Sequence, residues 1–281
     1  MNNISKILAI LSLPLLLNAC GGGGGGAGGA AGYTVPSCSG DSSTYTTAEY
    51  NYMGGASDAG TGAGKYGLGS VCAGAAYARG ATGDGILIAV LDSGISVGSG
   101  SSTDVTDIDA NIASFLTGSD VVNSDNVPQD DDNNGGTAIG SGHGSHVAGI
   151  IASEKNNSGG LHGVAYDSTL HIIKVLDSDG NGSATDIAAG MDLARGVSSM
   201  DIVNISIGGS TVTGSSSCNS ASSCETNLGS TLYTAMEALG AANIITVYAA
   251  GNSTNSSPSS LAGAAIYDDD FKETTVIAVA I

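Results

Sequence analysis

Asp92 and His143 are two side chains whose types and surroundings could support proton transfer. Asp92 directly follows the apolar run ILIAVL, and His143 opens the stretch HGSHVAGI, which has the apolar spacing of a helix. A histidine that moves protons needs a fixed tautomer, and a buried carboxylate that accepts its Nδ1 hydrogen provides one. We therefore expect Asp92 to accept a hydrogen bond from His143, although an aspartate after a strand is also a common turn or helix cap.

Short apolar runs alternate with helical patterns around these two residues. Runs that are almost continuously apolar are typical of parallel strands buried on both faces, and the candidates are Ile86 to Leu91, Leu170 to Leu176, Ile202 to Ile207, Ile244 to Ala250 and Thr275 to Ile281. Helical faces are formed by Ile187, Met191 and Ala194, and by Leu228, Leu232, Ala235, Met236 and Leu239, the second helix ending at Gly240. This alternation predicts an α/β fold, a doubly wound and mostly parallel sheet with helices on both faces.

Open parallel sheets carry their functional sites at the carboxyl ends of the strands, so the segments that follow the strands are informative. VLDSGI is followed in order by GHGSHVAG, GVAYDSTLHIIKVLDSDGNGS, IVNISIGG and VYAAGN. This series resembles the subtilisin family of serine peptidases over residues 83–281, with Ser145 where threonine is more usual. The resemblance implies an endopeptidase whose partners are protein or peptide substrates.

The resemblance also implies roles for individual residues. Asp92 would orient His143, His143 would be the general base, and Asn252 would donate its side-chain amide to the oxyanion. A strand edge that pairs with the substrate backbone would be formed by Ser206, Ile207 and Gly208. A wall of the pocket for the residue before the cut would be formed by Ala249, Ala250 and Gly251. Simple packing at the strand ends is the alternative explanation for these segments.

The nucleophilic serine that the resemblance requires is not found in the sequence. The family carries it in a motif similar to GTSMAxP, and no such motif follows Asn252. We therefore expect a fragment whose domain is incomplete at the C-terminus and which has no triad-type activity of its own. A non-catalytic surface lipoprotein that uses a decayed subtilase scaffold for binding or adhesion is the alternative. An α/β-hydrolase is disfavoured because the GxSxG motif is absent.

The N-terminal region predicts export. Lys6 precedes an apolar run that is too short to span a bilayer as a helix, so residues 1–19 are interpreted as a lipoprotein signal peptide. Cys20 resembles the cysteine of a lipobox and would provide the only attachment to a membrane, whereas an ordinary export signal is the alternative. A Gly-rich tether at residues 20–32 and an irregular extension at residues 33–82 precede the peptidase domain.

Two further features concern the location of the chain. We expect an outer-membrane, lipid-anchored or cell-surface protein. The segment LHGVAY and the short VLDSGI spacing resemble the subtilase passengers of autotransporters, which implies a β-barrel translocator outside this chain as a possible partner.

In an oxidising compartment cysteines can pair, and the favoured pairs are Cys38 with Cys72 and Cys218 with Cys224. Three pairings of these four cysteines are open, and four free thiols are the alternative.

The charge balance limits the possible partners. The chain has 7 Lys+Arg against 26 Asp+Glu, a formal net charge of -19, which repels phosphate backbones and disfavours nucleic acid.

Asp130, Asp132 and Asn134 resemble the start of a calcium loop, although the glutamate of an EF-hand is absent. Structural calcium is therefore a candidate, and no cofactor is required for the chemistry. The similar run DSDGNG from Asp177 is interpreted as a surface turn.

Overall fold

The computed structural model describes the chain from residue 68 onward, with gaps. The described residues are 68, 71, 73–97, 107–131, 142–155, 162–208, 220–251, 259–267 and 276–279. The predicted site residues that lie outside the described residues are Cys20, Cys38, Cys72, Asp132, Asn134, Cys218 and Asn252.

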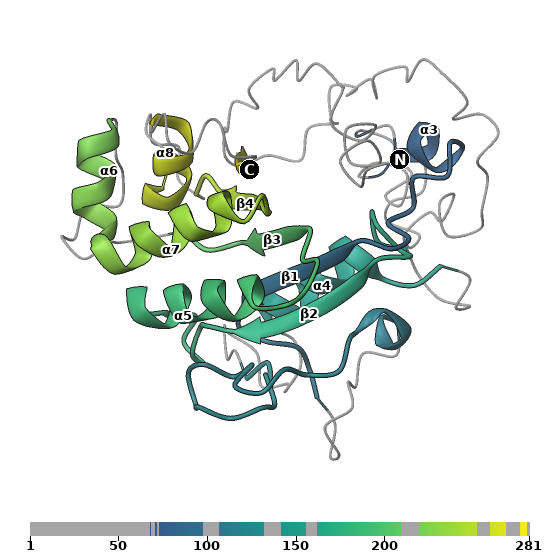
Figure 1. Cartoon of the computed structure of the whole chain (residues 1–281). Helices are drawn as coiled ribbons and strands as arrows, with labels where there is room; N and C mark the ends of the chain where they lie inside the picture. Colours follow the sequence, from purple (N-terminus) through teal and green to yellow (C-terminus); the bar gives the residue numbers. More distant parts are fainter. Residues whose placement is uncertain are drawn as a thin grey trace, which may run out of the picture.

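Five parallel strands form one sheet in the order β2-β1-β3-β4-β5 (Figure 1). The strands are β1 (Leu87–Asp92), β2 (Thr169–Lys174), β3 (Ile202–Ile205), β4 (Ile245–Ala249) and β5 (Val276–Val279). All five predicted strands are thus confirmed, with bounds that differ by a few residues. β1 lies between β2 and β3, with Leu91 opposite both Ile173 and Ile205. Asp92 therefore leaves the sheet at the point where the winding changes direction, which is where open α/β sheets carry their sites.

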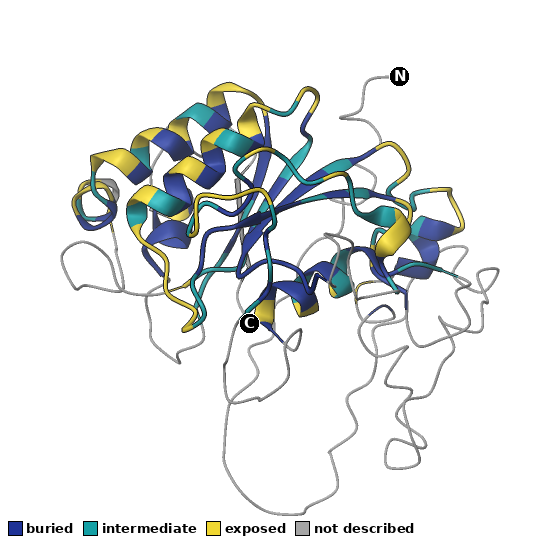
Figure 2. Cartoon of the chain, turned by 90° about the horizontal axis from the view of Figure 1, so that it is seen from below, coloured by how far each residue is buried: buried dark blue, intermediate teal, exposed yellow. Residues whose placement is uncertain are grey.

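Helices cover both faces of the sheet, as predicted. α5 (Ala184–Arg195) and α7 (Ser230–Ala241) pack on one face, to which Leu91 contributes its side chain. α4 (His143–Ala152) packs on the opposite face, to which Val90 contributes its side chain. The strands between these layers are largely buried (Figure 2). Alternate residues of β1 thus face different helices, which explains why its sequence is continuously apolar.

The helix predicted from Leu228 onward corresponds to α7 (Ser230–Ala241), and Leu228 itself is the last residue of a preceding helix that the sequence pattern does not predict. α6 (Ala221–Leu228) and α7 are separated by Gly229, which has φ 76° and ψ 153°. Gly240 does not end α7, because it is buried inside the last turn of that helix. The left-handed residue after the helix is Asn243, with φ 56°. Asparagine tolerates this conformation almost as glycine does, so the predicted stop at Gly240 is wrong.

Four elements occur in segments without a predicted helix. They are α3 (Ala73–Tyr77), the 3-10 helix η3 (Asp109–Asn111), α6, and α8 (Ser260–Tyr267). α6 begins with a capping box, in which the Ser220 side chain accepts from the Ser223 backbone and the Ser223 side chain accepts from the Ser220 backbone. α3 therefore lies within the extension before residue 83, and η3 lies within the long segment between β1 and α4.

Cys224 is buried in α6 and is disulfide-bonded. No other cysteine belongs to the described residues, so its pairing with Cys218 stays a prediction. None of the helices within the described ranges is long and apolar enough to cross a membrane.

Candidate active site

The hydrogen bond predicted between Asp92 and His143 is present. Asp92 is the last residue of β1, and its side chain is 1% exposed. Its Oδ1 lies 2.8 Å from His143 Nδ1 and accepts a second hydrogen bond of 2.8 Å from the Ser93 backbone. Because a carboxylate can only accept, the proton between Asp92 and His143 belongs to Nδ1. This bond selects the imidazole tautomer whose Nε2 is the basic nitrogen.

His143 is the first residue of α4 and does not face inward. The apolar residues Val147, Ile150 and Ile151, on the same side of the helix as His143, predict an inward-facing imidazole. The His143 side chain is instead 48% exposed, and Ile150 is 55% exposed. The reason is that the ring contacts the rim of the sheet at Asp92 rather than the core beneath it. One edge of the ring is fixed by the carboxylate, and the rest of the side chain is exposed at the surface.

Glycines allow the strand end and the helix start to approach each other closely. A Cβ added to Gly144 would overlap the backbone oxygen of Gly94, and Gly94 itself has φ 114°. The Gly144 backbone N–H donates to Ser93 Oγ at 2.8 Å. The glycines of the two motifs thus bring Asp92 and His143 within hydrogen-bonding distance.

The two predicted substrate-binding segments follow neighbouring strands. Ser206, Ile207 and Gly208 come directly after β3, while Ala249 ends β4 and is followed by Ala250 and Gly251. A Cβ added to Gly208 would lie 3.5 Å from the Gly251 Cα atom, so the two segments adjoin. Ser259 supports the second segment by donating from its Oγ to the Ala249 carbonyl at 2.7 Å.

A cavity of about 420 Å³ lies beside the predicted substrate edge. It is lined by Leu176, Gly180, Asn181, Gly182, Ala184, Ile187, Ile207, Gly208, Leu228, Leu232, Ser259, Ser260 and Leu261. Ile207 and Gly208 belong both to the cavity and to the strand edge. The cavity therefore adjoins the predicted substrate edge.

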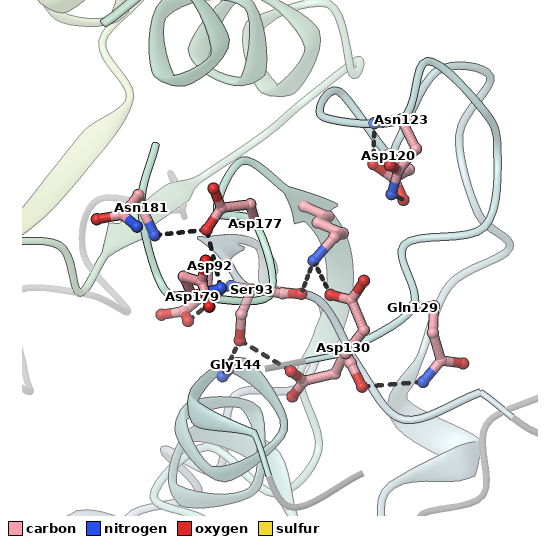
Figure 3. Close-up of polar contacts among 12 residues, drawn as sticks. Asp92, Ser93, Asp120, Asn123, Gln129, Asp130, Gly144, Asp177, Asp179 and Asn181 are labelled. Carbon is pink, nitrogen blue, oxygen red and sulfur yellow. Dashed lines mark hydrogen bonds and ion pairs between the residues drawn. The ribbon is translucent and has the colours of Figure 1, made fainter. Parts of the chain in front are cut away.

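The run from Asp177 forms the expected surface turn. Asp177 Oδ1 accepts from the backbone N–H groups of Asp179 and Asn181, both at 2.9 Å (Figure 3). Its acceptor capacity is used to close the turn. In the part of the chain that the structure describes, no group of three or more His, Cys, Asp or Glu side chains could hold a metal ion.

Comparison with known families identifies the family of this chain. The model of the "Subtilase family" matches residues 83–281. This chain belongs to the subtilase family. Subtilisin BL of Lederbergia lenta is 40% identical over 146 residues, which are 51% of this chain and 45% of that protein. A subtilisin of Bacillus pumilus is 35% identical over 199 residues, 70% of this chain and 58% of that protein.

Among solved structures, one titled as proteases from Pseudoalteromonas arctica has 32% sequence identity and a TM-score of 0.45, and the match covers 61% of this chain and 51% of that one. This chain thus spans about half the length of the relatives that it matches. The position of Asn252 as an oxyanion donor stays a prediction.

Two residues that position this site are not apparent from the motifs alone. Lys174 lies in the apolar strand β2 and is completely buried, and its Nζ donates to the Ser93 carbonyl at 2.9 Å and to Asp131 Oδ1 at 2.5 Å. Asp130 is also completely buried. A charged residue inside an apolar strand was the available sign for Lys174, since a buried lysine requires a partner.

Proposed function

We propose that this chain carries the acid-base and substrate-binding part of a subtilisin-like serine endopeptidase. The observation that carries the proposal is the hydrogen bond from His143 to the buried Asp92, which occurs in a member of the subtilase family. The sequence has no GTS-like serine motif. We therefore propose that a segment outside these 281 residues supplies the nucleophile.

In the proposed reaction His143 transfers a proton twice. Its Nε2 takes the proton of the serine hydroxyl as the serine oxygen bonds to the scissile carbonyl carbon, and it returns that proton to the leaving amine. Asp92 stabilises the imidazolium that exists between these steps. The side-chain amide of Asn252 would stabilise the oxyanion. Water then hydrolyses the acyl-enzyme with His143 again acting as the base.

The substrate is proposed to be an extended peptide. It would add as a strand along Ser206, Ile207 and Gly208, where main-chain hydrogen bonds provide affinity without sequence preference. Selectivity would come from the 420 Å³ cavity beside Ile207, where a substrate side chain would contact apolar residues such as Ile187 and Leu228 as well as polar groups. The small residues Ala249, Ala250 and Gly251 would leave room for the residue before the cut.

The direct test joins the chain to the coding sequence that follows it. The extended protein should cleave an unstructured protein substrate, whereas the 281-residue chain should not. Changing the serine of the downstream GTS-like motif to alanine, or His143→Ala, should each reduce kcat by on the order of 10⁶. An extended protein that binds but never cleaves would favour the non-catalytic lipoprotein instead.

We also propose that the protein is exported and lipid-anchored at Cys20, in the manner of an autotransporter passenger or another surface protease. The support is the apolar segment with Lys6 before it and the Gly-rich tether after it. Cells expressing the protein should incorporate a radiolabelled fatty acid into it, and Cys20→Ala should abolish the labelling. Unchanged labelling of that variant would contradict the anchor.

A further inference from the structure

Asp130 lies buried between the end of β1 and the start of α4. The chain around it runs beside the residues that follow Asp92, because the Ile95 N–H donates to the Pro128 carbonyl and the Asp130 N–H donates to the Ile95 carbonyl, both at 2.9 Å. These hydrogen bonds hold the backbone of Asp130 beside Ile95. The Asp130 side chain is completely buried, so it needs partners for its charge.

Both carboxylate oxygens of Asp130 have such partners. Oδ1 accepts from Ser93 Oγ at 3.0 Å, and Oδ2 accepts from the Ser145 backbone N–H at 2.9 Å and from Ser145 Oγ at 2.5 Å (Figure 3 shows the Ser93 bond). Ser93 is the neighbour of Asp92, and Ser145 lies two residues after His143. One carboxylate therefore joins the segments that carry the two members of the proton-transfer pair.

This carboxylate also takes the place of a cap on α4. The N-cap residue is Gly142, which makes no side-chain cap, and a Cβ added there would overlap the Asp130 side chain. The first N–H groups of a helix need acceptors, and here Gly144 donates to Ser93 Oγ while Ser145 donates to Asp130. The negative charge of Asp130 is favourable at this helix N-terminus.

The orientation of Asp92 depends on this arrangement. Its Oδ2 is buried and has no hydrogen-bond partner among the residues that the structure describes. Its Oδ1 accepts from the Ser93 backbone N–H and from His143 Nδ1. A displacement of Ser93 or of the start of α4 would therefore change the Asp92 to His143 hydrogen bond directly.

We propose that Asp130 is a positioning residue, which sets the distance between Asp92 and His143 by fastening Ser93 to the first turn of α4. Both of its carboxylate oxygens are engaged by Ser93 and Ser145, and its role as a calcium ligand with Asp132 and Asn134, which lie outside the described residues, stays a prediction. The inference deepens the proposed function, but it concerns the geometry of the pair and can be tested without turnover.

The test observes the imidazole of His143 in the 281-residue chain by NMR with ¹⁵N-labelled histidine. His143→Gln identifies the resonances of that ring. The wild-type chain should give a single Nδ1–H tautomer with a proton protected by Asp92. Asp130→Asn keeps the shape but loses one acceptor oxygen and the charge, so the protected proton should disappear and the two tautomers should mix. A wild-type spectrum for this variant would overturn the proposal.

The matched control is Asp186→Asn, which removes a carboxylate from the first turn of α5, where Asp186 accepts from Ser183 Oγ at 2.6 Å. It should leave the His143 spectrum unchanged, whereas an equal change would overturn the proposal. If Asp130→Asn does not fold, a second pair decides. Ser145→Ala loses the hydroxyl bond to Asp130 and should disturb the spectrum, while Ser145→Thr keeps the hydroxyl and should preserve it. Identical spectra for the two would contradict the proposal.

Two further measurements separate the alternatives. If Asp130 acted through bound calcium, EDTA would give the wild-type chain the spectrum of Asp130→Asn, and CaCl2 would restore it; we expect no effect of either. In the protein extended by its downstream sequence, Asp130→Asn should lower kcat by about 10- to 100-fold with little change in KM. Absence of cleavage in the extended wild type would contradict the proposed function alone, because the spectrum of His143 would still decide the role of Asp130.

Discussion

At the scale of single residues, glycine matters at this site for the space that it leaves. Gly144 and Gly149 both lie in α4, but only a Cβ at Gly144 would overlap another segment, at Gly94. Gly144→Ala should therefore reduce the free energy of unfolding by about 1 to 3 kcal/mol, as overpacking does. At Gly149 the added Cβ would lie 3.3 Å from Ser153 Oγ, a side chain that can rotate. Gly149→Ala should be neutral or stabilise by up to about 1 kcal/mol through helix propensity.

Urea unfolding measures the free energy of unfolding of the two variants. The NMR spectrum of the His143 imidazole shows whether each substitution also affects the site. Gly144→Ala should lose the protected Nδ1 proton because it separates α4 from the strand end, whereas Gly149→Ala should keep it. Equal unfolding midpoints and equal spectra would mean that the close approach of Gly144 and Gly94 is not required.

At the scale of the elements, β2 carries a second titratable group besides Lys174. His171 lies opposite Ala89, its Nδ1 is buried without a hydrogen-bond partner among the described residues, and burial lowers its pKa from the usual 6.5. The folded state therefore disfavours the protonated ring relative to the unfolded chain. The stabilisation is present above a pH of about 6.5 and is lost as the pH falls through the lower pKa of the folded state.

His171→Gln should remove part of this acid sensitivity. Thermal unfolding measured at pH 7.5 and at pH 5 should give a smaller decrease in Tm for His171→Gln than for the wild type. His146→Gln, which changes an exposed histidine of α4, is the control and should retain the wild-type decrease. If all three proteins lose the same Tm, the acid sensitivity arises elsewhere.

The elements also differ in how far the sequence predicts them. The strands lie in short, mostly apolar runs, which are typical of parallel strands buried on both faces, so all five are predictable. α6 and α8 are less predictable, because ASSCETNL buries Cys224, Asn227 and Leu228 among mostly polar residues and SLAGAAIY is apolar on every side. The role of Asp130 could not be predicted either, since its partners Ser93 and Ser145 are 37 and 15 positions away and an acidic run suggests a metal loop.

At the scale of the whole molecule, the family region does not contain all of the packed structure. The family match begins at residue 83, yet α3 precedes it and packs onto it. Tyr77 is 6% exposed, and its ring centroid lies 5.1 Å from that of Tyr166, in a cluster with Leu68 and Ala73. The Tyr77 hydroxyl donates to the Val164 carbonyl at 2.8 Å. The end of the N-terminal extension, at α3, is therefore a part of the folded domain.

Substitution of Tyr77 tests whether the extension and the family region unfold together. Tyr77→Ala removes a buried aromatic ring and should lower the free energy of unfolding by about 3 to 5 kcal/mol. Tyr77→Phe keeps the ring and loses only the hydrogen bond to Val164, so it should cost about 1 kcal/mol. Urea unfolding measures both changes, and limited proteolysis should cut the extension of Tyr77→Ala faster than that of the wild type. If Tyr77→Ala leaves the unfolding midpoint unchanged while its extension is cut faster, α3 is only loosely attached and the family region unfolds independently of it.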